Sequence, residues 1–217
     1  MKLESVGILI GMRPIGERDA VAHIFTRDYG VMCGVMRAAQ IMKKNRPLIG
    51  QIGAVSWNAR LDSQLGAFHW DAEKNMAAAL MLSRDALNVM NAAFALIDAL
   101  LPERERYDVL YAETIEFLNN AARPAPRECY LGWEIAFLRE LGYALDLSRC
   151  SGCGRTVGLD FLSPRTGRAV CCECGAPYIN KLYRLPLNLN TMMCFIDQVC
   201  NAQGVAVPAA RRMLAIL

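Results

Sequence analysis

Four cysteines in the C-terminal third are the residues whose type and spacing most clearly predict chemistry. Cys150 and Cys153 form one C-x2-C pair, and after seventeen intervening residues Cys171 and Cys174 form a second. Thiolates are zinc ligands, and two residues between them make a tight turn that brings both sulfurs to one ion. A glycine follows each pair, and glycine adopts a positive φ without a Cβ clash. The pattern predicts a small zinc ribbon with these four cysteines as ligands.

The predicted zinc is structural rather than catalytic. Four thiolates fill a tetrahedral ion and leave no position for the water that a catalytic zinc activates. Disulfides are an alternative that requires an oxidising compartment, and redox-active dithiols are another. No signal peptide is expected, because residues 1–5 lead directly into strand-like sequence. Cys172 is a fifth cysteine beside the site, either an alternative to Cys171 as a ligand or a reactive spare thiol.

Charge is distributed unevenly along the 217 residues, which are enough for one large or two modest domains. Residues 1–75 contain ten Lys and Arg against seven Asp and Glu, residues 76–147 six against eleven, and residues 148–217 eight against three. Basic ends around an acidic middle are typical of a nucleic-acid surface built from both ends. Charges interrupt every apolar run well before eighteen residues, so we expect a cytoplasmic protein with no membrane partner.

The first 75 residues predict a β-barrel of the OB type. Alternating apolar residues indicate five short strands near residues 6–12, 20–25, 31–36, 54–59 and 65–70, separated by turn signals. The connection after the third strand is basic, and no acidic residue occurs between Asp28 and Asp62. We predict a DNA-binding surface on the barrel, with a merely solvated loop as the alternative. Its residues are Arg13, Arg37, Lys43, Lys44, Arg46 and Arg60.

Aromatic, histidine and further arginine side chains are the remaining candidates for function. Trp57, Phe68 and Trp70 either stack on bases or fill the barrel core, and the core is favoured for at least two of them. His23 and His69 lack a partner motif and are not expected to be catalytic. A second DNA-contact patch is predicted around the ribbon, from Arg149, Arg155, Arg165 and Arg168.

Helical periodicity replaces the strand pattern after residue 71. Helices are predicted over residues 76–82 and, after a cap at Ser83, over 85–101. A further helix is predicted with an apolar face from Tyr107 to Leu118, and another runs from Pro126 to Gly142. Two more follow the ribbon, at 189–201 and 208–217, and are expected to pack back onto the helical domain. A solvated helix face is expected to carry Glu103, Glu105, Asp108, Glu113 and Glu116.

The fold class is therefore α+β and multidomain. We predict an OB-fold DNA-binding domain at residues 1–75, a helical domain at 76–147, a four-cysteine zinc ribbon at 148–185, and C-terminal helices at 186–217.

Taken together, these residues resemble the RecO family of recombination and repair mediators. One match is Gly16-Glu-Arg-Asp-Ala20 followed by Phe25-Thr-Arg-Asp-Tyr-Gly30, preceded by Gly7-Ile-Leu-Ile10. The others are Trp133–Tyr143, the run from Leu145 through Cys150 into C-x2-C-G and Phe161-Leu-Ser-Pro164, and Val207–Arg211. They cover nearly the whole chain in the family order.

The resemblance implies an OB barrel, a helical domain and a zinc ribbon. It also implies binding of single- and double-stranded DNA, annealing of complementary strands, and help in loading RecA onto strands coated by single-stranded-DNA-binding protein. RecR, RecF and the acidic C-terminal tail of the coating protein would be partners, the tail on the helical domain. The location would be the nucleoid.

Two hypotheses from other classes remain. A zinc-dependent nuclease or deaminase needs an open coordination position and a nearby carboxylate or histidine, which a four-cysteine site without a companion histidine does not provide. A structural zinc adaptor in transcription would bind a protein partner without binding free DNA.

Overall fold

A computed structural model describes residues 1–17, 19–37, 47–60 and 65–215. The chain forms two compact units. The first comprises Met1–Tyr130 with Pro208–Arg211, and the second comprises Leu131–Val207 with Arg212–Leu217. The division by sequence into four segments stays a prediction, and Lys43, Lys44 and Arg46 lie outside the described residues.

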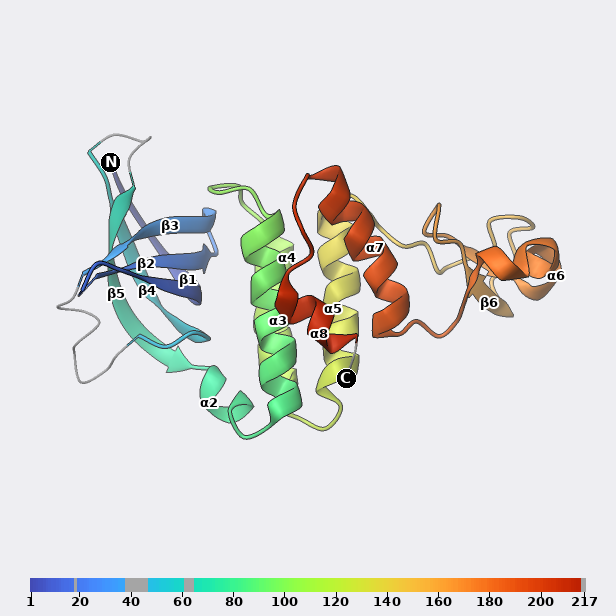
Figure 1. Ribbon diagram of the computed structural model, residues 1–217, viewed down its shortest axis with the longest axis horizontal. Coiled ribbons are helices and arrows are strands. Elements are labelled where there is room, and N and C mark those ends of the chain that lie inside the picture. The colour runs from blue at the N-terminus through green and yellow to red at the C-terminus, as the bar shows by residue number, and fades with distance from the viewer. Residues whose placement is uncertain (18, 38–46, 61–64, 216–217) are drawn as a thin grey trace. The chain divides into compact units, whose positions relative to one another are not determined.

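Five strands of the first unit close into a barrel in the order β1-β2-β3-β5-β4 (Figure 1). The strands are β1 (Lys2–Ile15), β2 (Asp19–Thr26), β3 (Gly30–Met36), β4 (Gln51–Asn58) and β5 (Gly66–Asn75). All neighbours pair antiparallel except β3 and β5, which are parallel. Alternation along β4 buries every second residue, as expected where one face of a strand lines a core. The predicted OB-type barrel is confirmed.

Aromatic side chains fill the barrel interior. Trp57, Phe68 and Trp70 are all at most 5% exposed and pack with Leu9 and Ile24 in one core cluster. The indole N–H of Trp57 donates to the carbonyl of residue 33 at 3.0 Å, which satisfies its polar atom inside the core. The prediction that at least two of these aromatics are core residues is confirmed, and none of the three is placed to stack on bases.

Helices complete the first unit. They are α2 (Ala77–Leu80), α3 (Arg84–Leu100), α4 (Asp108–Asn120) and α5 (Pro126–Glu140), whose last residues belong to the second unit. The hydroxyl of Ser83 accepts the N–H of Ala86 at 3.3 Å, so the predicted cap is confirmed. Glu103 and Glu105 precede α4, so the prediction that they share a solvated helix face is wrong.

The reason is that the segment after α3 pairs with the barrel. Val31 and Glu103 form a parallel β-bridge, and the N–H of Arg104 donates to the carbonyl of Val31 at 2.8 Å. The Arg104 guanidinium carbon lies 4.4 Å from the centre of the Trp57 ring. Backbone pairing, which periodicity does not indicate, thus holds this acidic stretch against the barrel and outside a helix.

The second unit contains the ribbon and most of the C-terminal helical segment, apart from residues 208–211, which belong to the first unit. Strand β6 (Leu159–Leu162) pairs antiparallel with β7 (Ala169–Cys171) in a hairpin. Helix α6 (Cys172–Gly175), the 3-10 helix η1 (Ala176–Lys181) and strand β8 (Tyr183–Arg184) follow, and β8 pairs with β6. Helices α7 (Leu189–Ala202) and α8 (Ala209–Leu214) end the described chain. No helix among the described residues is long and apolar enough to cross a membrane.

Candidate metal centre and nucleic-acid surface

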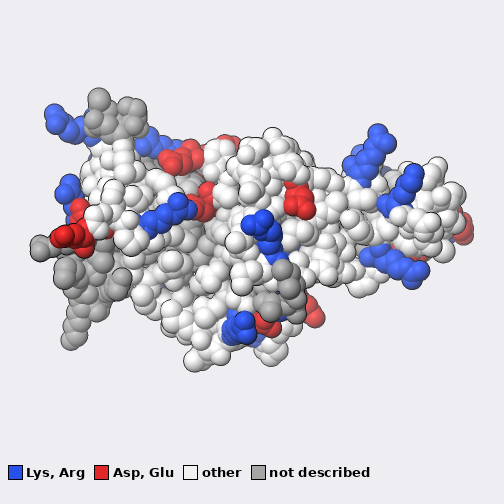
Figure 2. All heavy atoms as spheres, in the orientation of Figure 1, with Lys and Arg blue, Asp and Glu red and all other residues white. Residues whose placement is uncertain are grey.

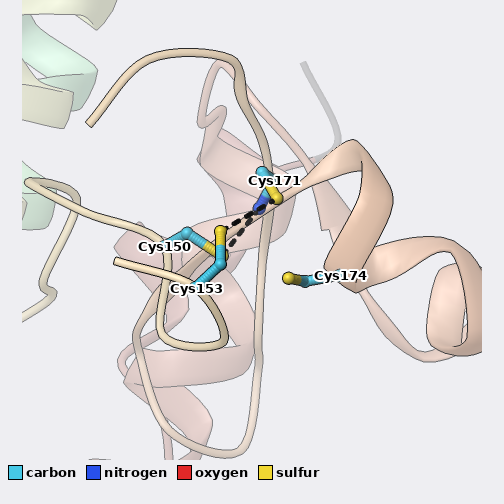
Figure 3. Close-up of side chains that lie close together, drawn as sticks. All are labelled: Cys150, Cys153, Cys171 and Cys174. Carbon is cyan, nitrogen blue, oxygen red and sulfur yellow. Dashed lines mark hydrogen bonds between the residues drawn. The ribbon is translucent and has the colours of Figure 1, made fainter. Parts of the chain in front are cut away.

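The first cysteine pair sits on a tight turn. The N–H of Gly154 donates to the carbonyl of Cys150 at 2.9 Å, and the N–H of Cys150 donates to the carbonyl of Arg155 at 2.8 Å. Gly154 has φ +78°, as the sequence predicted for the glycine after the pair. The turn holds Cys150 and Cys153 on the same side of the loop (Figure 3).

The second pair is built differently. Cys171 ends β7 and Cys174 lies one turn later on α6. Gly175 has φ −82°, so the expectation of a positive φ is wrong for this half of the ribbon. Glycine is needed there for space instead, because a Cβ on Gly175 would lie 2.8 Å from the Phe161 ring.

The four sulfurs converge. The Sγ atoms of the two pairs all lie within 4.8 Å of one another, and Cys153 Sγ is 3.7 Å from Cys171 Sγ (Figure 3). A tetrahedral zinc ion with bonds of about 2.3 Å places its sulfurs about 3.8 Å apart. The donor set therefore fits a metal ion of this size and preference, and these four cysteines can hold one.

Backbone N–H groups already favour thiolate at this cluster. The N–H of Cys171 donates to Cys150 Sγ at 3.3 Å, and that of Gly152 does so at 3.4 Å. Such donors, with Cys171 the largest, lower the pKa of the Cys150 thiol to about 6. The neighbouring sulfurs of Cys171, Cys153 and Cys150 raise the pKa of Cys174 to about 12. Four sulfurs this close resist full ionisation until a cation neutralises them.

Cys172 stands apart from this cluster. It is exposed, whereas Cys171 is fully buried, and its N–H donates to Asp160 Oδ2 at 3.0 Å. The geometry therefore brings the Cys171 sulfur, and not the Cys172 sulfur, to the other three. The structure describes all nine cysteines, and no two of them form a disulfide.

Of the predicted basic residues of the barrel, the structure describes Arg13, Arg37 and Arg60, and all three are exposed. Arg13 on β1 lies 3.7 Å from Asp98 Oδ2, so its charge is partly neutralised. Met36, Phe68 and Trp57 occupy one rung of the sheet. Arg37 comes directly after the end of β3 at this rung, whereas Arg60 lies beyond the end of β4, which runs in the opposite direction. The two residues therefore leave the sheet on opposite sides of the rung.

The predicted basic residues of the ribbon are also exposed. Arg149, Arg165 and Arg168 make no ion pair with any residue that the structure describes, whereas Arg155 pairs with Glu173 at 2.6 Å. On the face drawn in Figure 2, several Lys and Arg side chains project from the ribbon, at the right of the view. Whether any of these residues contacts DNA stays a prediction.

Sequence reasoning missed a polar cluster around His23. Its Nδ1 contacts Asp98 Oδ1, and its Nε2 lies 3.4 Å from Cys33 Sγ. Burial, with a contribution from Glu103, raises the pKa of the Cys33 thiol to about 12. Since the thiolate is the nucleophilic form, this thiol is not activated. Asp98 lies 75 positions from His23, so no local motif could have revealed the contact.

Comparison with known proteins places these features in a family. A family model described as the C-terminal part of recombination protein O matches residues 81–195. The DNA repair protein RecO of Jannaschia sp. (strain CCS1) is 40% identical over 185 residues, which cover 84% of this chain and 74% of that protein. The chain belongs to the RecO family. The resemblance noted from the sequence is thereby confirmed.

Other RecO relatives show the same extent of similarity. The DNA repair protein RecO of Rhizobium rhizogenes (strain K84) is 36% identical over 189 residues, covering 86% of this chain and 72% of that protein. The DNA repair protein RecO of Cereibacter sphaeroides (strain ATCC 17023) is 36% identical over 192 residues, covering 87% and 79%. The similarity therefore includes both the barrel and the cysteine cluster of this RecO-family chain.

Proposed function

We propose that this chain is a recombination mediator that binds single- and double-stranded DNA, anneals complementary strands, and assists RecA loading onto DNA coated by single-stranded-DNA-binding protein. The observation that carries the proposal is membership of the RecO family over most of the chain, combined with the closed barrel order of an OB fold. The proposed protein partners are RecR, RecF and the acidic tail of the coating protein, the tail docking on the helical region.

Annealing by this route needs no catalytic group. Two strands repel each other through their phosphates, and a protein that holds both on cationic side chains lowers that repulsion. Base pairing then supplies the free energy. Exposed Arg37 and Arg60, with the predicted contacts of Lys43, Lys44 and Arg46, would supply the barrel's positive charge. We infer on this basis that the chain is not an enzyme.

The proposed zinc is a structural clamp. Four thiolates at the observed separations would complete the coordination of the ion, so the metal would cross-link the turn at Cys150 to the end of β7 and to α6. The small ribbon core, in which the buried residues are Phe161, Val170 and two of the cysteines, makes such a cross-link important for folding.

An annealing assay tests the proposal. Two complementary oligonucleotides, each coated with single-stranded-DNA-binding protein, are mixed with and without the chain across a salt series. We expect acceleration that fades with salt and that weakens when Lys43, Lys44 and Arg46 are all changed to alanine. Three lost phosphate contacts lower the slope of log affinity against log salt by about 2 on single strands.

A matched control removes the same charge elsewhere. Alanine replaces three exposed arginines of the helical region, namely Arg84, Arg106 and Arg123. On the same oligonucleotides without the coating protein, this control is expected to anneal as the unchanged chain does, because the acidic tail that would dock on the helical region is then absent. A folded, metal-loaded sample that gives no acceleration at low salt would refute the mediator function and favour the zinc adaptor.

A further inference from the structure

The ribbon contains a pocket that the proposed function does not use. Its volume is 460 Å³, within the range of sites that hold small ligands. Every residue of its lining belongs to the second unit. They come from the first cysteine turn, the β6–β7 hairpin, and the α6–η1 segment: Ser151, Gly152, Ser163, Pro164, Arg165, Thr166, Val170, Cys174, Tyr178, Lys181 and Leu182.

The lining combines an apolar floor with positive charge. Val170 and Leu182 are apolar, Tyr178 presents an aromatic ring that is 60% exposed, and Arg165 and Lys181 are cations. None of the described residues in the lining is acidic. The pocket therefore suits a ligand with a flat apolar part and a negative charge.

Both acidic residues of the ribbon are engaged elsewhere. Glu173 accepts two hydrogen bonds from the Arg155 guanidinium, at 2.6 and 3.2 Å. Asp160 accepts the N–H of Cys172 at 3.0 Å. Neither Arg165 nor Lys181 forms an ion pair with a residue in the described part of the chain. An incoming anion would therefore meet two uncompensated cations.

The pocket wall formed by the hairpin turn is held in place. The N–H of Gly167 donates to the carbonyl of Ser163 at 2.9 Å, and the side-chain amide of Gln198 on α7 donates to the carbonyl of Pro164 at 3.1 Å. On the first cysteine turn, the N–H of Ser151 donates to the carbonyl of Ala169 at 2.9 Å. These bonds preform the cavity, which lowers the entropy cost of filling it.

We propose that this pocket holds one unpaired nucleotide of single-stranded DNA, with the base against Tyr178 and the phosphate between Arg165 and Lys181. Stacking of bases on exposed aromatic rings beside cations is how single strands are bound without sequence preference. A base inside a duplex is stacked on its neighbours and cannot enter. The pocket thus selects single over double strands. This inference rests on the proposed DNA-binding function.

The test measures affinity of the full-length, zinc-loaded chain by fluorescence anisotropy with labelled (dT)15 and with a 15-base-pair duplex. Tyr178→Ala is expected to weaken single-strand binding about 5-fold or more and to leave duplex binding unchanged. Tyr178→Phe, which keeps the ring, retains the affinity. The control Tyr143→Ala removes a 39% exposed tyrosine of the same unit outside the pocket and has no effect.

A second arm separates charge from stacking. Arg165→Ala with Lys181→Ala lowers the salt slope on single strands by about 0.7, because the two cations neutralise one phosphate, whereas Tyr178→Ala leaves the slope unchanged. A third arm uses a strand of fifteen abasic residues. The unchanged chain binds it more weakly than (dT)15, and Tyr178→Ala narrows that difference. Zinc content equal to that of the unchanged chain shows that each variant retains its ribbon.

The outcomes distinguish the two proposals. Single-strand binding that persists at full affinity in Tyr178→Ala would overturn the pocket while leaving the mediator function intact. Failure of the unchanged chain to bind any DNA would overturn both. If Tyr178→Ala instead loses binding of an acidic, aromatic-containing peptide and keeps its affinity for (dT)15, the pocket is a protein-binding site and the nucleotide assignment is wrong.

Discussion

Replacing Gly30 by alanine tests how the segment after α3 is fastened to the barrel. Gly30 begins β3 with φ +63°, and a Cβ built on it would lie 1.7 Å from the carbonyl oxygen of Glu105. Ordinary contact begins at 3.4 Å, so the backbone at Glu105 must retreat by about 1.7 Å. That shift pulls on the adjacent Arg104, whose N–H bonds to Val31 at 2.8 Å.

The expected cost follows from three contributions. Alanine at positive φ costs about 1 kcal/mol. Loss of the Arg104 to Val31 hydrogen bond adds about 1 kcal/mol. Displacement of the Arg104 guanidinium from the Trp57 ring adds about 0.5 to 1 kcal/mol. The free energy of unfolding should therefore fall by about 3 kcal/mol.

Comparing the urea unfolding of Gly30→Ala with that of Gly16→Ala isolates the effect of the contact with the Glu105 carbonyl. Gly16 has φ +60°, close to that of Gly30, but a Cβ there meets nothing within 4 Å. Its replacement should cost about 1 kcal/mol, from backbone conformation alone. Equal losses in the two variants would refute the close approach of Glu105 to β3 and, with it, the reason given for Glu103 and Glu105 lying outside a helix.

Three further predictions concern single side chains. Ser83→Ala removes the cap of α3 and should lower the free energy of unfolding in urea by about 1 kcal/mol, whereas Ser83→Gly should cost only a few tenths. The Ser5 hydroxyl, and then Arg27, lower the pKa of Asp28, so its contribution to stability is present above about pH 4 and is lost as pH falls below. Asp28→Asn should therefore be less stable than the unchanged chain at pH 7, and the difference should shrink by pH 3; a constant difference would contradict the pairing. Cys171→Ser should reduce bound zinc measured by metal analysis, whereas Cys172→Ser should retain one equivalent, and the reverse result would exchange their roles.

The sequence predicted the structural features that depend on a few neighbouring residues. Alternating apolar residues located all five barrel strands, and Ser83 located the start of α3, because burial and capping act over a few residues. The ends of the strands were harder to predict from the sequence. Strand β5 continues to Asn75 through a run of exposed residues, because Asn75 pairs with Gln51. Such an extension depends on the partner strand and leaves no alternation in its own sequence.

In the candidate site, too, the features set by nearby residues were predicted and those that join distant segments were not. C-x2-C spacing predicted that the two sulfurs of each pair lie close together, which a loop turn achieves for Cys150 and Cys153 and one helical turn for Cys171 and Cys174. The pocket beside them was not predicted, because its lining joins segments from Ser151 to Leu182 that come together only after the hairpin forms. The link from His23 to Asp98 likewise spans the barrel and α3 and has no signal in either element.

The cysteine cluster and the pocket share residues, and this predicts how metal and DNA binding are coupled. Cys174 belongs to the cluster and also lines the pocket, and Tyr178 follows it by four residues on η1. A zinc ion at the cluster would therefore fix the wall that carries the stacking ring. Stripping the metal should weaken binding of (dT)15 as Tyr178→Ala does, while duplex binding by the barrel persists. The two losses should not add, because both remove the same contact. Protease cleavage of the stripped protein should rise between residues 148 and 185 and spare the barrel. Metal removal that weakens single- and double-strand binding equally would show that the ion supports the whole molecule rather than this pocket.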